Sequence, residues 1–420
     1  MDVQKREMQN GLVAVTEVMP YLHSAAIGVW VKSGSRCENE ADAGVSHFIE
    51  HLLFKGTTTK SALAIAKAID SVGGQLNAFT EKEYVCLHAK VLDRHLPFAL
   101  GILADIALNP TFPADEMERE REVIFEEISM IEDSPQDLIQ DLYMENLWKG
   151  HPLGRPISGT RESVERITRA KVKQYFRDNY TAHNTIISIA GNIQHASARR
   201  LVERYFGELE PGVPVDPGPP PECRASNLVR AKPNLEQTHL CLGTGCPPVT
   251  SEKRYALHLL CNILGGGVSS RLFQSIREKR GLAYSIYSSL NLYRDVGTLS
   301  VYAGAAPDKV MPVIELVIKE LKKMCRQPVP AHELRRAKDN LLGSVMLSLE
   351  SSSSRMTQLA QQQIYFDRFY TPEEIIREFE SVEAEDIQGL CQDVFDSAPL
   401  SLTLLGSQDG REVESMNLEV

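Results

Sequence analysis

The chain has 420 residues, of which 43% are hydrophobic, and it carries a formal net charge of −11 at pH 7. This length exceeds one ordinary domain and suits two domains of about 200 residues each. The excess of acidic residues argues against a nucleic-acid partner, and neither a membrane span nor a signal peptide is predicted from the apolar runs. Eight cysteines without C-x-x-C spacing indicate neither disulfides nor a cysteine zinc site, so we expect a cytoplasmic protein with reduced thiols.

The first strongly apolar segment, residues 25–31, predicts a strand, and residues 44–56 predict a helix. Within this helix His47 and His51 are four residues apart, with Glu50 beside them. At 3.6 residues per turn both imidazoles lie on one face, within reach of one metal ion. The order His-x-x-Glu-His is the inverted form of a metallopeptidase signature. A chance match is the alternative, but these side chains are costly to bury in an apolar helix without a partner, so we predict a metal site.

A hydrolytic zinc site needs a third protein ligand and an open position for water, and the predicted helix 115–133 is the best source of that ligand. Its buried stripe consists of Met117, Ile124, Ile128 and Ile131. Glu120 and Glu127 lie at the margin of this stripe, whereas Glu126 points roughly opposite and is expected to be solvated. Either the two marginal acids bind a nearby cation, or they reach solvent or pair with Arg121.

A proline-rich segment, residues 211–221, cannot form a helix or a central strand and predicts an extended linker. We take residues 211–226 as the linker between an N-terminal domain, 1–210, and a C-terminal domain, 227–420. Each half opens with an apolar strand and closes with a glycine-ended strand, at 25–31 and 185–191 in the first half and at 239–243 and 400–406 in the second.

An internal duplication is indicated by a helix start that recurs with an offset of 217 residues, at 113–119 and at 330–336. At this offset Leu264 and Val268 stand where His47 and His51 would be, so the second copy is predicted to lack metal ligands. The mixture of strands and helices predicts an α+β fold class, with two homologous domains that each contain an antiparallel or mixed β-sheet backed by helices.

Together these motifs resemble the pitrilysin family of zinc metallopeptidases, and most closely its short prokaryotic members similar to the β-subunit of the mitochondrial processing peptidase. Residues 44–57 match the metal helix of the family, Glu120 and Glu127 match its second-helix pair, and residues 151–157 are similar to a further family segment. The resemblance covers essentially the whole chain.

The resemblance implies a zinc endopeptidase with one Zn²⁺ per chain, held by His47, His51 and Glu127. Glu50 would then act as the general base that takes a proton from the attacking water and passes it to the leaving amine. Glu120 would orient the site or an imidazole.

The resemblance also gives a role to a glycine turn at residues 73–74 and the edge strand that it precedes. In the family this strand pairs with an extended substrate peptide through the residues that correspond to Asn77, Ala78, Phe79 and Thr80. From sequence alone it is an ordinary edge strand. Arg277 and Tyr284 match a family pair that reaches substrate, although without the resemblance we would expect a surface charge and the start of a strand.

The assembly implied by the resemblance is a homodimer that encloses a chamber for peptides or unfolded segments, with Arg277 and Tyr284 acting in trans. Two alternatives stay open: a non-catalytic peptide-binding or scaffold subunit, and the zinc-bearing subunit of a hetero-oligomeric processing peptidase. The complete ligand set argues against the first alternative, and the presence of Arg277 and Tyr284 in the same chain argues against the second.

Overall fold

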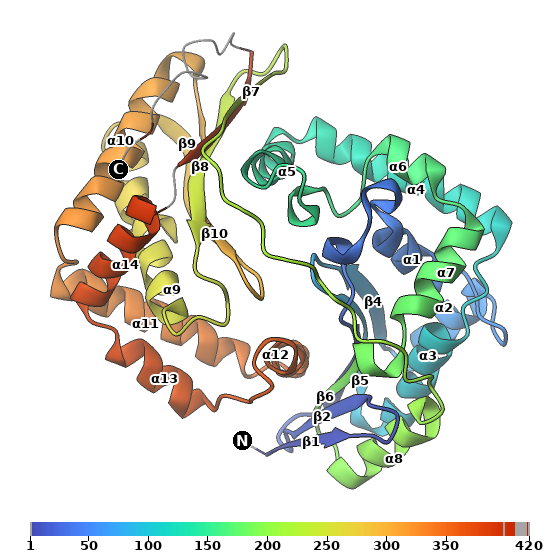
Figure 1. Ribbon diagram of the computed structural model, residues 1–420. Helices are drawn as coiled ribbons and strands as arrows, with labels where there is room; N and C mark the ends of the chain where they lie inside the picture. The colour runs from blue at the N-terminus through green and yellow to red at the C-terminus, as the bar shows by residue number, and fades with distance from the viewer. Residues whose placement is uncertain (1, 398–399, 408–417, 419–420) are drawn as a thin grey trace. The chain divides into compact units, whose positions relative to one another are not determined.

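The computed structural model describes residues 2–397, 400–407 and 418, and it forms two compact units, each built on one β-sheet (Figure 1). The first unit comprises Met1–Ser129, Arg155–Pro219 and Met346–Thr371, and the second comprises Met130–Gly154, Pro220–Val345 and Pro372–Val420. Each half of the chain therefore gives one segment to the unit formed mainly by the other half. The sequence predicted two continuous domains, 1–210 and 227–420, and did not predict that the two halves exchange segments.

The sheet of the first unit has six strands in the order β1-β2-β6-β3-β5-β4. The strands are β1 (Val3–Glu7), β2 (Val13–Val18), β3 (Ser24–Val31), β4 (Gln75–Thr80), β5 (Val85–Leu92) and β6 (Thr185–Gly191). Strands β2 and β6 are parallel and all other neighbours are antiparallel. Strand β4 lies at one edge of this sheet and pairs with β5 on its inner side.

Helices cover both faces of this sheet, which explains why β3 is apolar throughout. The helices of the first unit are α1 (Val45–Leu53), α2 (Ala62–Asp70), α3 (Leu96–Leu108), most of α4 (Ala114–Asp133), α6 (Arg161–Arg166), α7 (Arg169–Asn179), α8 (His195–Phe206) and α12 (Ser352–Tyr365). Ile27 and Val29 of β3 belong to the large core that includes α1, α3 and α8. Ala26 and Trp30 point to the opposite face, where they pack with Met356 of α12.

Helix α12, from the C-terminal half of the chain, packs closely on β3 and β6. Gly28 permits this approach, since a Cβ atom there would lie 2.5 Å from the Met356 sulfur. Arg355 and Glu17 form a buried ion pair across the interface, with 2.6 Å between Nε and Oε2. Burial of a hydrophobic face and of a matched charge pair fixes this helix on the sheet.

The second unit contains a five-stranded sheet in the order β7-β11-β8-β10-β9. Its strands are β7 (Asn227–Ala231), β8 (Thr238–Cys246), β9 (Ala283–Leu292), β10 (Gly297–Ala305) and β11 (Ser401–Gly406), and its helices are α5 (Pro135–Leu147), α9 (Arg254–Gly265), α10 (Val310–Arg326), α11 (Ala331–Ser348), α13 (Pro372–Ser381) and α14 (Ala384–Ser397). Helix α5, from the N-terminal half, packs on β8 and β11, whereas α9, α10 and α14 contact β9, β10 and β8. Only β7 and β11 pair in parallel.

The two sheets share one topology, because the order β2-β6-β3-β5-β4 repeats as β7-β11-β8-β10-β9. The offset of 217 residues recurs in the helices: it separates the starts of α4 and α11, and also the starts of the exchanged helices α5 and α12. The predicted fold class, two homologous α+β domains, is confirmed. Among the described residues, no helix has the length and apolar character needed to cross a membrane.

Candidate metal centre

Helix α1 presents the His-x-x-Glu-His motif on its polar face. Its opposite face is buried through Val45, Ser46, Phe48, Ile49, Leu52 and Leu53, which leaves His47, Glu50 and His51 partly accessible. The helix begins after Gly44, whose φ of +93° is left-handed and whose Cβ would lie 2.6 Å from the Ser158 carbonyl oxygen. A side chain at this position would be strained, so glycine fixes the start of the helix that carries the motif.

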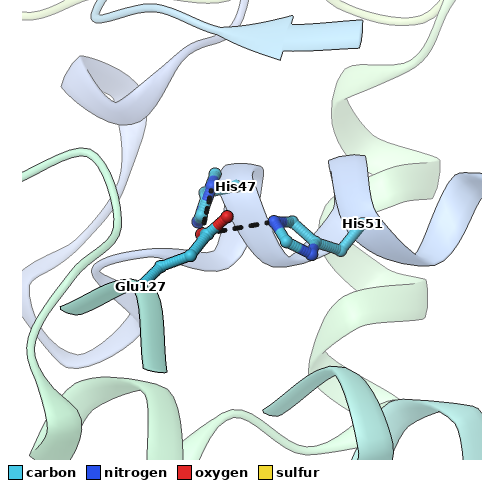
Figure 2. Close-up of side chains that lie close together, drawn as sticks. All are labelled: His47, His51 and Glu127. Atoms are coloured by element: carbon cyan, nitrogen blue, oxygen red, sulfur yellow. Dashed lines mark ion pairs between the residues drawn. The ribbon is translucent and has the colours of Figure 1, made fainter. Parts of the chain in front are cut away.

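Helix α4 adds Glu127 to the two histidines (Figure 2). Glu127 Oε2 lies 3.4 Å from Nε2 of His47 and 3.5 Å from Nε2 of His51. One ligand atom from each of the three residues lies within 4.8 Å of the other two. Glu126 is exposed on the same helix, as the sequence predicted.

This arrangement fits a zinc ion. Tetrahedral zinc with bonds of about 2.0–2.1 Å separates its ligand atoms by roughly 3.3–3.4 Å, which is close to the two spacings between carboxylate and imidazole. Burial, and secondarily the neighbouring His51, lowers the pKa of His47 to about 4. A neutral imidazole is the form that binds a metal, so the site favours the required protonation state of His47.

Glu120, seven residues or about two turns before Glu127 on α4, contacts the second histidine. Its Oε2 lies 3.1 Å from Nδ1 of His51, and its Oε1 lies 2.5 Å from Nζ of Lys55. A carboxylate on the far ring nitrogen fixes the tautomer in which Nε2 is available to a metal. Lys55 was not predicted as part of the site. Its position four residues after His51 was the available signal, but from sequence it indicated only the end of the helix.

Glu50 is held by a neighbouring strand. The hydroxyl of Thr80, the last residue of β4, donates a hydrogen bond of 2.6 Å to Glu50 Oε2. Burial raises the pKa of Glu50, and the Thr80 hydrogen bond opposes this shift. Thr80 is also one of the residues predicted to pair with substrate, and its side chain holds the carboxyl group beside the two histidines.

The other residues expected to bind substrate lie along β4, which has the predicted edge position. The side chain of Asn77 is exposed and that of Ala78 is buried, as expected for alternating faces. Phe79 packs against Trp30, with ring centroids 5.7 Å apart. The strand is therefore packed from both faces of the sheet, because Ala78 belongs to the core on the opposite face, which includes α1.

Arg277 and Tyr284 lie in the second unit, where they contact each other. The Arg277 guanidinium carbon is 5.6 Å from the centroid of the Tyr284 ring and 4.7 Å from that of Phe273. Arg277 belongs to a short π-helix, η6 (Phe273–Glu278), and Tyr284 to the start of β9. Tyr284 is 74% exposed, so its hydroxyl is accessible to a partner molecule.

Comparison with known proteins identifies both halves. Residues 13–161 match the family "Insulinase (Peptidase family M16)", and residues 166–341 match "Peptidase M16 inactive domain". The chain is 41% identical over 393 residues to a Bacillus subtilis protein called uncharacterized zinc protease YmxG, covering 94% of this chain and 96% of the relative. It is also 41% identical over 398 residues to an uncharacterized zinc protease of Mycobacterium tuberculosis, with 93% and 90% covered.

Solved structures also share the fold, and two of them serve as examples. A protease from Helicobacter pylori superposes with a TM-score of 0.90 at 22% identity, covering 96% of this chain and 99% of the other. A Pseudomonas fluorescens structure described as a peptidase M16 inactive domain gives 0.89 at 22% identity, with 97% and 99% covered. The family resemblance inferred from the sequence is confirmed: the chain belongs to the insulinase, or M16, family of zinc proteases.

Proposed function

We propose that this chain is a zinc-dependent endopeptidase whose metal is held by His47, His51 and Glu127, one ion per chain. The observation that carries the proposal is the convergence of these three side chains, with Glu50 fixed beside them. The relatives named zinc proteases, which match nearly the whole chain, support the same activity.

When bound by His47, His51 and Glu127, a zinc ion would act as a Lewis acid and lower the pKa of water at the site to about 7. Glu50 takes the proton from the attacking water and delivers it to the leaving amine. Thr80 keeps the Glu50 carboxyl group pointed at the reacting centre, and Glu120 keeps the His51 ring in the orientation that the metal requires.

Strand β4 is the proposed binding site for the substrate main chain. Its outer edge offers backbone groups to an extended peptide, and its last residue, Thr80, is hydrogen-bonded to Glu50. A peptide added to this edge would therefore pass beside the catalytic carboxyl group. Backbone pairing requires an extended substrate, so peptides and unfolded segments are the expected substrates, and folded proteins should resist cleavage.

Arg277 and Tyr284 are proposed to donate hydrogen bonds to the substrate or to the tetrahedral intermediate, in trans within a homodimer. The exposure of Tyr284 and its contact with Arg277 support a role for the two residues as a pair. We propose the cytoplasm as the location, supported by the eight cysteines, none of which forms a disulfide bond in the structure.

The activity is tested by mass spectrometry of a diverse peptide mixture incubated with zinc-loaded protein, with chelator-treated protein and with Glu50→Gln. Cleavage by the zinc-loaded wild type alone is expected, and the products would reveal the sequence preference. If zinc binds but no peptide is cut, a non-catalytic peptide-binding subunit or a missing partner chain becomes the better explanation.

The homodimer is tested by mixing two inactive variants, Glu50→Gln and Tyr284→Phe. Hybrid dimers would contain one site with an intact Glu50 and an intact Tyr284, so partial activity should return. Absence of recovery, with subunit exchange demonstrated by differently tagged chains, would contradict action in trans.

A further inference from the structure

The N-terminus of the metal helix is held by a buried acid that the proposed mechanism does not use. Glu38 is only 4% exposed. Its Oε2 accepts a hydrogen bond of 2.7 Å from the Gly44 amide, and its Oε1 accepts one of 2.7 Å from the Ser46 amide. The first amides of a helix have no partner inside the helix. A carboxyl group that accepts hydrogen bonds from two of these amides therefore fixes the position and the direction of the helix start.

Glu38 itself extends from a turn that is attached to the loop after the edge strand. The turn is the short 3-10 helix η1 (Ser35–Cys37). The Ser35 amide donates to the Glu81 carbonyl at 3.2 Å, and the Arg36 amide donates to the Lys82 carbonyl at 2.7 Å. The Arg36 guanidinium also donates to Glu83 Oε1 at 2.8 Å. Loop 81–84 joins β4 to β5, so the turn that carries Glu38 is tied to the strand that ends in Thr80.

A second contact secures the same end of α1. The Ser46 hydroxyl lies 3.0 Å from the Tyr175 hydroxyl, which lies 3.1 Å from that of Ser33. Tyr175 belongs to α7, so this contact holds α1 from the side of a neighbouring helix. Ser46 directly precedes His47, and a shift of its amide would move the first metal ligand.

We infer that Glu38 is a positioning residue, which holds the start of α1 against the loop after β4 and so sets His47 and Glu50 relative to the edge strand. This inference rests on the proposed function only for its effect on catalysis. The effect of Glu38 on metal binding and on the rigidity of α1 can be measured without any catalytic activity.

The test compares Glu38→Gln with Glu17→Gln. Glu17 is a matched control, since it is a buried acid of the same unit, and its ion pair with Arg355 lies away from α1. For Glu38→Gln we expect a loss of zinc affinity of about 10-fold or more, measured by competition with a chelator, and a similar loss of kcat with little change of KM. Amide exchange of Gly44 and Ser46 should also become faster. Glu17→Gln should lower the unfolding temperature without these changes.

Glu38→Asp provides a second variant if Glu38→Gln fails to fold. The aspartate side chain is one methylene shorter, so its carboxyl group cannot reach both amides unless the backbone shifts. An intermediate loss of zinc affinity is therefore expected. The inference would be overturned if the Glu38 variant that folds had the same zinc affinity and the same amide exchange rates as the Glu17→Gln control. If the peptidase proposal is wrong, the wild type will be inactive. The Glu38 variants should still show the expected changes in zinc affinity and amide exchange.

Discussion

The two copies of the duplicated fold differ sharply at the positions of the proposed metal ligands. Both copies keep the same strand order, and in each a helix from the other half of the chain covers one face of the sheet. At the offset of 217 residues, however, Leu264 and Val268 replace the two histidines, and Ala337 and Ser344 replace Glu120 and Glu127. The second copy folds without any of the proposed ligands, so the fold does not require the site.

The two copies also differ in the helix that packs on the edge strand β4 or β9. Helix α1 keeps a polar face with His47 and His51, whereas α9, which packs on the equivalent strand β9, ends at Gly265 with Leu264 fully buried. Val268, at the position of His51, lies beyond this helix and is 69% exposed. The helix of the second copy thus ends three residues before the position that corresponds to His51. This contrast predicts that substitutions at the site will affect activity strongly and stability weakly, and that substitutions at the shared packing features will do the reverse.

The largest expected effect concerns Glu50, which has no acidic counterpart in the second copy, where Gly267 stands at the same offset. Glu50→Gln should lower kcat by about 10²–10⁴-fold while zinc stays bound, because the proposed general base is lost and the proposed ligands are intact. The measurement is steady-state cleavage of a quenched fluorescent peptide with parallel metal analysis. Glu126→Gln, at an exposed position of α4, is the control and should retain activity; equal activity of both variants would remove Glu50 from the mechanism.

The exchanged helix α12 provides the converse test, since it belongs to the shared fold. Arg355→Met leaves Glu17 buried without this partner and should lower the free energy of unfolding by about 3–5 kcal/mol, with the zinc affinity of the folded protein unchanged. Denaturant unfolding followed by circular dichroism measures the loss. Arg335→Met, which removes an exposed ion pair with Asp339 and Glu380, should have little effect. A weakened zinc site in Arg355→Met would mean that fold and site are coupled.

Stability should depend on pH through Glu38, a group specific to the first copy. Burial raises the pKa of Glu38 to about 7, against the lowering effects of its amide hydrogen bonds and of nearby Arg155. The ordinary carboxyl pKa is 4.5, so the folded state binds this proton more tightly than the unfolded state does, and stability should fall as pH rises from about 4.5 to 7. The contribution is on the order of 3 kcal/mol.

This pH dependence is measured by denaturant unfolding at several pH values between 4.5 and 8. Glu38→Gln should show a flatter profile than the wild type, because the titrating group is removed. Tyr175 also faces Glu38, but burial raises its pKa far above this window, so it should not titrate there. Identical slopes for the two proteins would show that Glu38 keeps its ordinary pKa.

The smallest expected effect is that of Glu120, which contacts His51 and Lys55 without joining the three clustered donors. Glu120→Gln should weaken zinc binding by about 10–100-fold, since the His51 ring loses a charged partner on Nδ1. Glu122→Gln, exposed two residues further along α4, is the control in the same chelator competition. Undiminished affinity in Glu120→Gln would leave this acid with a structural role only.

Local patterns in the sequence predicted much of the architecture and the centre of the site. The spacing of His47, Glu50 and His51 follows from helical periodicity, and the helical wheel of α4 correctly separated exposed Glu126 from Glu127. The duplication was visible because the offset of 217 residues is conserved between α4 and α11.

Features that depend on contacts distant in sequence were not predicted. The exchange of α5 and α12 leaves no local signal, because each helix looks like an ordinary amphipathic segment of its own half. The same holds for Thr80 and Lys55, whose partners Glu50 and Glu120 lie 30 and 65 residues away along the chain. Glu38 escaped notice because a capping acid seven residues before the helix that it caps resembles a surface charge.

A calorimetric titration of metal-free protein with zinc tests whether the chain has a single zinc site, confined to the first copy. We expect one ion bound per wild-type chain and none at this site in the double variant His47→Ala, His51→Ala, with both proteins folded. Two ions per chain, or unchanged binding by the double variant, would contradict it.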